Sequence, residues 1–360
     1  MIFPRRIDRY IVREFLGPFL FCVFGFTVIL ISGLLFELTD LIFVKSVPVR
    51  TVGRMLLYKL PGMAVMTLPI AVLFATLVSL GRLVQDSEMK VMRVSGLSFP
   101  RIILPVLILG LVISGLTYWA SEEIVPEANH KFENTLRRIV FTEGIPLIEE
   151  NVFFYGGENR YFYISEVAND TRELRNILVY ELGQGVFPRL TTAKRGRYED
   201  NIWVLYDGIV QELDSEGFVT HETRFQQLEI VTDQGADVFL GNQRTTDEMN
   251  RRELREHIER FQRSGLKVLS FVVDYHIKLA MPMSSLIFAL FAAPMTLHSR
   301  AGRSFGVAVT LIVLLLYYVG TSVARSLGVN GVLPPLVSAW LVNGLFAVIG
   351  ITLILRSDRA

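Results

Sequence analysis

The sequence predicts a multi-pass α-helical membrane protein with six transmembrane helices and an inserted, jelly-roll-like antiparallel β domain. Its 360 residues are 51% hydrophobic with a mean hydropathy of +0.42, too apolar for an ordinary soluble protein. Charged residues still make up 20% of the chain, and they are concentrated in one central block. Apolar stretches of membrane-spanning length occur only before and after this block. The chain therefore divides into two membrane halves and a soluble insert.

The two membrane halves, residues 1–120 and 276–360, each contain three apolar stretches. We expect the spans at 15–36, 63–80, 99–120, 277–297, 305–324 and 332–355, each near the roughly 20 residues that cross a bilayer as a helix. The first stretch is too long for a cleavable signal peptide and lacks a small-residue cleavage site. An even number of spans places both termini on one side.

Lys and Arg residues predict which side that is. The termini and the connections on their side contain Arg5, Arg6, Arg9, Arg13, Arg82, Lys90, Arg93, Arg101, Arg300, Arg303, Arg356 and Arg359. The opposite short connections contain only Lys45, Arg50, Arg54, Lys59 and Arg325. Because Lys and Arg are retained on the cytoplasmic side, both termini and the 81–101 connection are expected there, with the 121–275 block outside.

The 121–275 block has the pattern of a β domain with a helix on either side. Runs rich in aromatic and β-branched residues occupy 152–155, 161–167, 177–181, 202–206, 209–213 and 225–231, and turn residues such as Asp207-Gly208 separate them. Short strands at this spacing are typical of an antiparallel sandwich or roll, expected at about 141–240. Charged helices are expected at 122–139 and from Thr246-Asp247-Glu248 to Gly265.

The connection between the second and third spans predicts a cytosolic amphipathic helix at about residues 82–96. Drawn as a helix, its charged face contains Arg82, Asp86, Lys90 and Arg93. The opposite face contains Val84, Val91, Met92 and Ser95, with one charge, Glu88. Gly96 is placed to end this helix, and Ser98 to cap the next one, with Pro100 in its first turn.

An apolar face with a single carboxylate has two interpretations. The helix could lie on lipid headgroups. However, a carboxylate is costly to bury in a lipid-facing stripe, and a protein groove with a basic residue suits it better. Glu88 with Val84, Val91 and Met92 is therefore the candidate docking face.

The sequence lacks the residues that several classes of function require. The chain has no GxxxxGK[ST] loop, and its spans carry no ionisable residue in their middle thirds for coupling to an ion gradient. The histidines and the single cysteine, Cys22, show no metal-ligand spacing, and no nucleophile–base pattern indicates an enzyme. The net charge of +1 gives no case for nucleic acid. Asn343, deep in a span, is expected to make an interhelical hydrogen bond. Energy for any transport must then come from a partner.

Several short local sequences resemble those of a known protein family. They are Arg9-Tyr10, Ser87-Glu88, Met92, Ser95-Gly96, Pro126-Glu127-Ala128-Asn129, Tyr275, Lys278-Leu279-Ala280, Pro282, Trp340 and Asn343. With the order of three spans, an outer β domain and three more spans, they resemble the lipopolysaccharide-export ABC permease family of the LptF/LptG (YjgP/YjgQ) type over the whole chain.

The resemblance implies a transporter subunit in the cell inner membrane, with its β domain in the periplasm. Two paralogous or identical permeases would pair and be driven by a cytosolic ABC ATPase dimer of the LptB type, which binds the ATP. Lipopolysaccharide would pass from the outer leaflet to periplasmic β-roll bridge proteins of the LptC/LptA type. The family's ATPase-docking glutamate corresponds to Glu88.

The chain departs from the family pattern near the outer end of the first span. Some permeases of the LptG branch carry a lysine there, whereas this chain has Phe36-Glu37. Lys45, Arg50 and Arg54 follow and are the candidate lipid-binding cations, with ordinary headgroup contact as the alternative.

Two other functions remain open from the sequence. One is an ABC permease for another lipid or a lipoprotein, and the other is a non-transporting membrane anchor that presents a β domain. Co-purification of an ATPase separates the anchor from the permeases, and the identity of bound lipid separates the permeases from each other.

Overall fold

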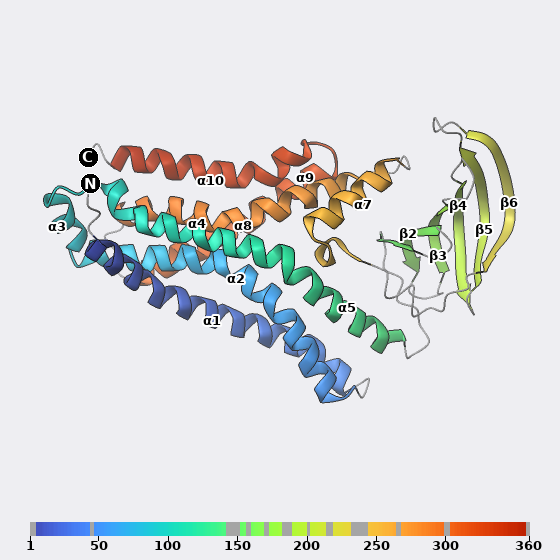
Figure 1. Ribbon diagram of the computed structural model, residues 1–360, viewed down its shortest axis with the longest axis horizontal. Coiled ribbons are helices and arrows are strands. Elements are labelled where there is room, and N and C mark those ends of the chain that lie inside the picture. Colours follow the sequence, from blue (N-terminus) through green and yellow to red (C-terminus); the bar gives the residue numbers. More distant parts are fainter. Residues whose placement is uncertain are drawn as a thin grey trace. The chain divides into compact units, whose positions relative to one another are not determined.

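The computed structural model describes residues 5–43, 47–141, 152–155, 160–168, 173–181, 189–199, 202–213, 219–231, 244–263, 268–298 and 303–357. It comprises a helical unit, Met1–Asn129 with Met249–Ala360, and a β unit, His130–Glu248 (Figure 1). This confirms the predicted fold class, a helical membrane protein with an inserted antiparallel β domain.

Six long helices of the helical unit are apolar enough to cross a membrane, as predicted. They are α1 (Arg5–Phe43), α2 (Val49–Gln85), α4 (Phe99–Glu123), α8 (Leu269–Met295), α9 (Arg303–Val329) and α10 (Pro335–Ser357), with the short α3 (Glu88–Val94) between α2 and α4. α2 begins well before the predicted residue 63 and contains Pro61 as well as Pro69. Packed transmembrane helices tolerate such prolines.

Two hydrophobic clusters hold these helices together. One joins α1, α2, α3, α4 and α8 and includes Phe15, Met89 and Phe99. The other joins α2, α8, α9 and α10 around Phe288 and Tyr317. Within the helical unit, α3 lies at the same end as the beginning of α1 and the end of α10 (Figure 1).

The polar group predicted deep in the last span connects three helices. Tyr317 of α9 donates its hydroxyl hydrogen to Oδ1 of Asn343 in α10 at 2.8 Å. The Asn343 amide donates in turn to the carbonyl of Ala280 in α8 at 2.7 Å. The expected interhelical hydrogen bond of Asn343 is confirmed, and it satisfies a side chain that is only 2% exposed.

The β unit contains one six-stranded antiparallel sheet in which neighbouring strands are consecutive in sequence. The strands are β1 (Val152–Tyr155), β2 (Arg160–Ala168), β3 (Glu173–Glu181), β4 (Arg189–Glu199), β5 (Ile202–Leu213) and β6 (Val219–Val231). The described strands thus form a meander, without the crossing connections of a jelly roll. The polar β4 was not predicted, and Asp207-Gly208 lies within β5 instead of forming a turn.

A crease crosses this sheet. Asn176 in β3 and Asp207 in β5 have positive φ angles of 51° and 53°. Buried residues alternate on either side of them, but across the crease they are three residues apart, at Leu174 and Ile177 and again at Leu205 and Gly208. This change in alternation keeps one face of the sheet buried in both halves of each strand, while the pairing continues in register across it.

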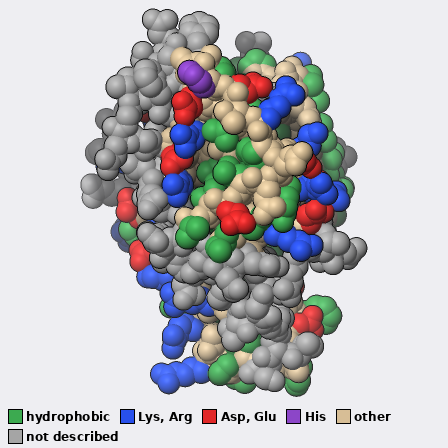
Figure 2. All heavy atoms as spheres, turned by 90° about the vertical axis from the view of Figure 1, so that its right-hand side faces the viewer, with side chains coloured by type: hydrophobic (Ala, Val, Ile, Leu, Met, Phe, Trp, Pro, Cys, Tyr) green, Lys and Arg blue, Asp and Glu red, His purple; other side chains and the backbone are tan. Residues whose placement is uncertain are grey.

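Charged side chains on the sheet are paired across neighbouring strands. Arg195 of β4 contacts Asp207 of β5 at 2.8 Å, and Arg189 contacts Glu212 at 2.9 Å. On the face of the molecule seen in Figure 2, acidic and basic side chains lie along both sides, with mostly hydrophobic and uncharged side chains between them. Cross-strand pairs of opposite charge favour a single register.

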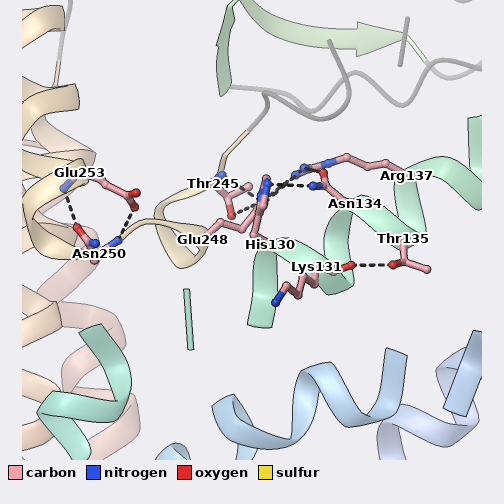
Figure 3. A network of polar contacts seen from close by, with 9 residues as sticks. All are labelled: His130, Lys131, Asn134, Thr135, Arg137, Thr245, Glu248, Asn250 and Glu253. Carbon is pink, nitrogen blue, oxygen red and sulfur yellow. Dashed lines mark hydrogen bonds and ion pairs between the residues drawn. The ribbon is translucent and has the colours of Figure 1, made fainter. Parts of the chain in front are cut away.

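The first and last residues of the β unit meet in a buried ionic cluster (Figure 3). Helix α5 (Val125–Phe141) contributes His130 and Arg137, and the 3₁₀ helix η1 (Thr246–Glu248) contributes Glu248. One carboxylate oxygen of Glu248 lies 2.8 Å from Nη2 of Arg137, and the other lies 2.8 Å from Nδ1 of His130. The side chains of Glu248 and Arg137 are 0% and 3% exposed. This cluster of His130, Arg137 and Glu248 connects the two segments by which the chain enters and leaves the β unit, and we call it the neck.

The structure corrects the start of the charged helix that was expected from Thr246 to Gly265. After η1, helix α7 (Arg251–Arg263) begins with a reciprocal capping box. The Asn250 N–H donates to Glu253 at 3.0 Å, and the Glu253 N–H donates to the Asn250 side chain at 2.8 Å (Figure 3). Gly265 lies outside the described residues.

Candidate functional site

The connection between α2 and α4 contains a short helix between two turns. The prediction of one helix over residues 82–96 is wrong at its first turn, since α2 ends at Gln85 and α3 begins at Glu88. Ser87 between them has a left-handed backbone, with φ at 60°. Its N–H donates to the carbonyl of Val84 at 3.1 Å. The faces of α2 and α3 are therefore not continuous.

The predicted end of this helix is confirmed. Gly96 has a φ of 92°, which glycine adopts without strain. Its N–H donates to Arg93 at 3.0 Å, and the N–H of Leu97 donates to Met92 at 3.2 Å, as in a Schellman motif. Ser98 is extended at the N-cap position of α4, which has Pro100 in its first turn, but its side chain does not make the expected capping hydrogen bond. The second turn is therefore fixed by backbone hydrogen bonds.

Two apolar side chains anchor the connection in the core. Met89 of α3 is 2% exposed, and Phe99 at the start of α4 is fully buried. Val84 and Met92 of the predicted docking face also pack against this core. Val91 is 65% exposed and Val94 is 90% exposed, and they lie on the same short helix as Glu88. Of the predicted docking face, Glu88 and Val91 are therefore the accessible members. The exposed Val94, which the prediction did not include, lies one turn beyond Val91 on the same helix.

Glu88 belongs to a polar network with the beginning of α1. Its Oε2 accepts a hydrogen bond from the hydroxyl of Tyr10 at 2.7 Å, and its Oε1 lies 3.9 Å from Nη2 of Arg82. Arg82 donates to Tyr10 at 3.2 Å and to Glu14 at 2.6 Å. The carboxylate remains partly accessible, with 34% of its side chain exposed.

A second ion pair ties α1 to the other end of the connection. Arg101, in the first turn of α4, contacts both carboxylate oxygens of Asp8 at 2.9 Å. Such bidentate pairs are strongly directional. Sequence patterns gave no signal for these partners, because Tyr10 and Asp8 are 78 and 93 positions from Glu88 and Arg101.

The candidate lipid-binding cations lie at the opposite end of α2. Arg50 and Arg54 are exposed near its first turn, while Lys45 lies outside the described residues. At 1.5 Å per residue, Arg50 and Arg82 are separated by about 48 Å along the helix. The structure therefore does not bring these cations and Glu88 into one site.

One face of the sheet contains an open pocket of about 430 Å³. Its walls come from both sides of the crease and include Thr191, Val210, Leu228 and Ile230. Charged residues border it at one end, where Arg160 contacts Glu181 at 2.9 Å. Polar and charged groups thus form much of its lining, and the pocket carries no assignment to a ligand.

Comparison of the sequence with known proteins identifies the family of this chain. The family model described as "Lipopolysaccharide export system permease LptF/LptG" matches residues 9–356. The LptF permease of Escherichia coli K12 is 23% identical over 366 residues, covering 96% of this chain and 94% of the relative. The LptG permease of the same strain is 21% identical over 322 residues, covering 85% and 86%. LptF of Shigella flexneri is also 23% identical over 366 residues. The chain therefore belongs to the LptF/LptG family of lipopolysaccharide export system permeases.

Proposed function

We propose that this chain is a permease subunit that extracts lipopolysaccharide from the outer leaflet of the inner membrane and passes it to a periplasmic β-roll bridge. A cytosolic ATPase dimer of the LptB type supplies the energy and binds the ATP, and a paralogous or identical permease pairs with this chain in the membrane. The observation that carries this proposal is the exposed Glu88–Val91–Val94 face on a connection anchored in the core at Met89 and Phe99. A docked ATPase moves α2 and α4 through such a connection without entering the membrane.

The candidate lipid-binding cations Lys45, Arg50 and Arg54, which we call the rim, allow a direct test of which lipid is transported. After gentle purification, the full chain with its partners should retain lipopolysaccharide, detected by mass spectrometry of the bound lipid. Replacing Lys45, Arg50 and Arg54 by glutamine should lower the retained amount severalfold, because cations at the rim pair with lipid phosphates. Arg356→Gln, near the end of α10, is the matched control and should leave it unchanged. Retention of another lipid class would favour a permease for that lipid. Unchanged retention in the triple variant would show that these three cations make only ordinary contacts with lipid headgroups.

The orientation is a second prediction. Single cysteines placed at Lys90 and at Lys194 in a Cys22→Ser background should differ in labelling by a membrane-impermeant maleimide. Position 194 should be labelled once the outer membrane is permeabilised, and position 90 only after cell lysis, because the Lys and Arg distribution places α3 in the cytoplasm. Both side chains are exposed, so accessibility within the fold does not decide the result. The reverse pattern would invert the whole topology.

A third prediction concerns the edges of the β sheet. β1 and β6 each have one pairing edge without a neighbour among the described strands, and a strand of another protein can add to such an edge. Photo-crosslinkers at Phe154 of β1 or at Gln226 of β6 should therefore trap a periplasmic β-roll protein of the LptC/LptA type. Arg175 in the interior strand β3 is the control position. Crosslinks only within the chain, or equal trapping from Arg175, would favour a β domain that serves as a spacer.

A further inference from the structure

The contact between α1 and α3 assigns a role to a residue outside the docking face. We propose that Tyr10 is a positioning residue: its hydroxyl fixes the orientation of the Glu88 carboxylate so that a cation of the ATPase can pair with it. This inference rests on the proposed docking role of Glu88 and adds the group that orients it.

The direction of the hydrogen bonds follows from their chemistry. The Arg82 guanidinium only donates, so the Tyr10 oxygen accepts from Nη2 of Arg82 at 3.2 Å. The hydroxyl hydrogen of Tyr10 is then directed at Oε2 of Glu88, 2.7 Å away. This short bond to a charged acceptor fixes the rotamer of a side chain on a helix of only seven residues.

The same arrangement leaves the second carboxylate oxygen available. Oε1 lies 3.9 Å from Arg82, beyond hydrogen-bond distance, and the Glu88 side chain is 34% exposed. Arg82 itself is held by Glu14 at 2.6 Å and by Asp86 at 3.4 Å. Because these two carboxylates offset the charge of Arg82, Glu88 still presents negative charge to an incoming guanidinium.

Tyr10 is in turn fixed by its surroundings. Its ring packs, partly buried, against the cluster that contains Ile11, Phe15 and Met89. The preceding turn of α1 is tied to α4 by the Asp8–Arg101 pair. The hydroxyl therefore has a defined place relative to α3, which a positioning role requires.

Tyr10→Phe tests the proposal, because it removes the hydroxyl and keeps the ring. The assembled permease pair would be titrated with the ATPase in nanodiscs, and both the dissociation constant and the ATP hydrolysis coupled to lipopolysaccharide release would be measured. We expect Tyr10→Phe to weaken ATPase binding about tenfold, which corresponds to about 1.4 kcal/mol. Tyr58→Phe, in α2, is the matched loss of a tyrosine hydroxyl and should have no effect.

The double variant separates positioning from general stability. In the Glu88→Gln background, Tyr10→Phe should cause no further loss of binding, because the charge that it orients is absent. An equal loss in both backgrounds would show that Tyr10 acts elsewhere and would overturn the proposal. If Glu88→Gln weakens binding and Tyr10→Phe does not, the positioning role fails and the docking role stands. If neither change alters binding, the docking role itself fails.

Discussion

Replacing Glu88 by arginine is expected to abolish lipopolysaccharide export and to weaken ATPase association roughly 100-fold or more. A charge pair in a docked interface is worth about 2–5 kcal/mol once one partner is removed, and reversal adds repulsion. Association would be measured by co-purification and titration, and export by lipopolysaccharide transfer from proteoliposomes.

Three companion variants make this result specific. Glu88→Gln removes the charge without placing a second cation beside Arg82, so it separates lost docking from local repulsion. Lys90→Glu changes an exposed charge of the same helix and should leave export near normal. An acidic replacement of the ATPase cation proposed to pair with Glu88 should partly restore Glu88→Arg. If Glu88→Arg proves as harmless as Lys90→Glu, α3 rests on lipid and does not couple to the ATPase.

Replacing Glu248 by glutamine should destabilise the neck of the β unit by about 3–5 kcal/mol. The change keeps the shape of the side chain but removes the negative charge beside Arg137, whose side chain is 3% exposed. Hydrogen exchange and limited proteolysis of the full chain should report the loss within residues 130–248. Glu256→Gln is the matched control, because its pairing with Arg252 on α7 is exposed and worth at most about 0.5 kcal/mol.

The stability of the neck should also depend on pH. Burial disfavours the charged form of Glu248, but hydrogen bonds from His130 and Arg137 outweigh it and lower the pKa of this carboxyl. A carboxyl with a lowered pKa contributes its stability above the pKa of the unfolded chain and loses it as pH falls through the folded value. Protection of the β unit should therefore decline below about pH 4 in the wild type. The Glu248→Gln variant should lack this contribution, and an identical decline in both proteins would contradict the prediction.

Local sequence patterns predicted the parts of the fold that local physics determines. Six apolar stretches gave the six membrane helices because length and hydropathy suffice. Gly96 was recognised as the end of α3 because a left-handed residue there favours glycine. Strand β1 was predicted with its observed limits from its aromatic and β-branched run.

Other features depend on partners distant in sequence or on rare backbone angles. Strand β4 consists largely of polar residues and pairs only because β3 and β5 lie on either side. The break at Ser87 and the crease at Asp207 involve positive φ at residues other than glycine, which few sequence signals mark. Glu88 was predicted as a docking residue from the sequence, but its hydrogen bond to Tyr10 crosses 78 positions and required the tertiary structure. The docking and lipid-binding roles stay predictions.

Helix α2 runs without interruption from the proposed docking connection to the candidate lipid-binding cations. Its last turn adjoins the connection that contains Glu88, and its first turns contain Arg50 and Arg54. Over the roughly 48 Å between Arg50 and Arg82, a tilt of about 5° displaces one end by about 4 Å relative to the other. Pro61 and Pro69 each lack an N–H donor, so α2 is expected to bend most easily at these two positions. A movement that starts at the docking connection is therefore expected to change direction there before it reaches Arg50 and Arg54.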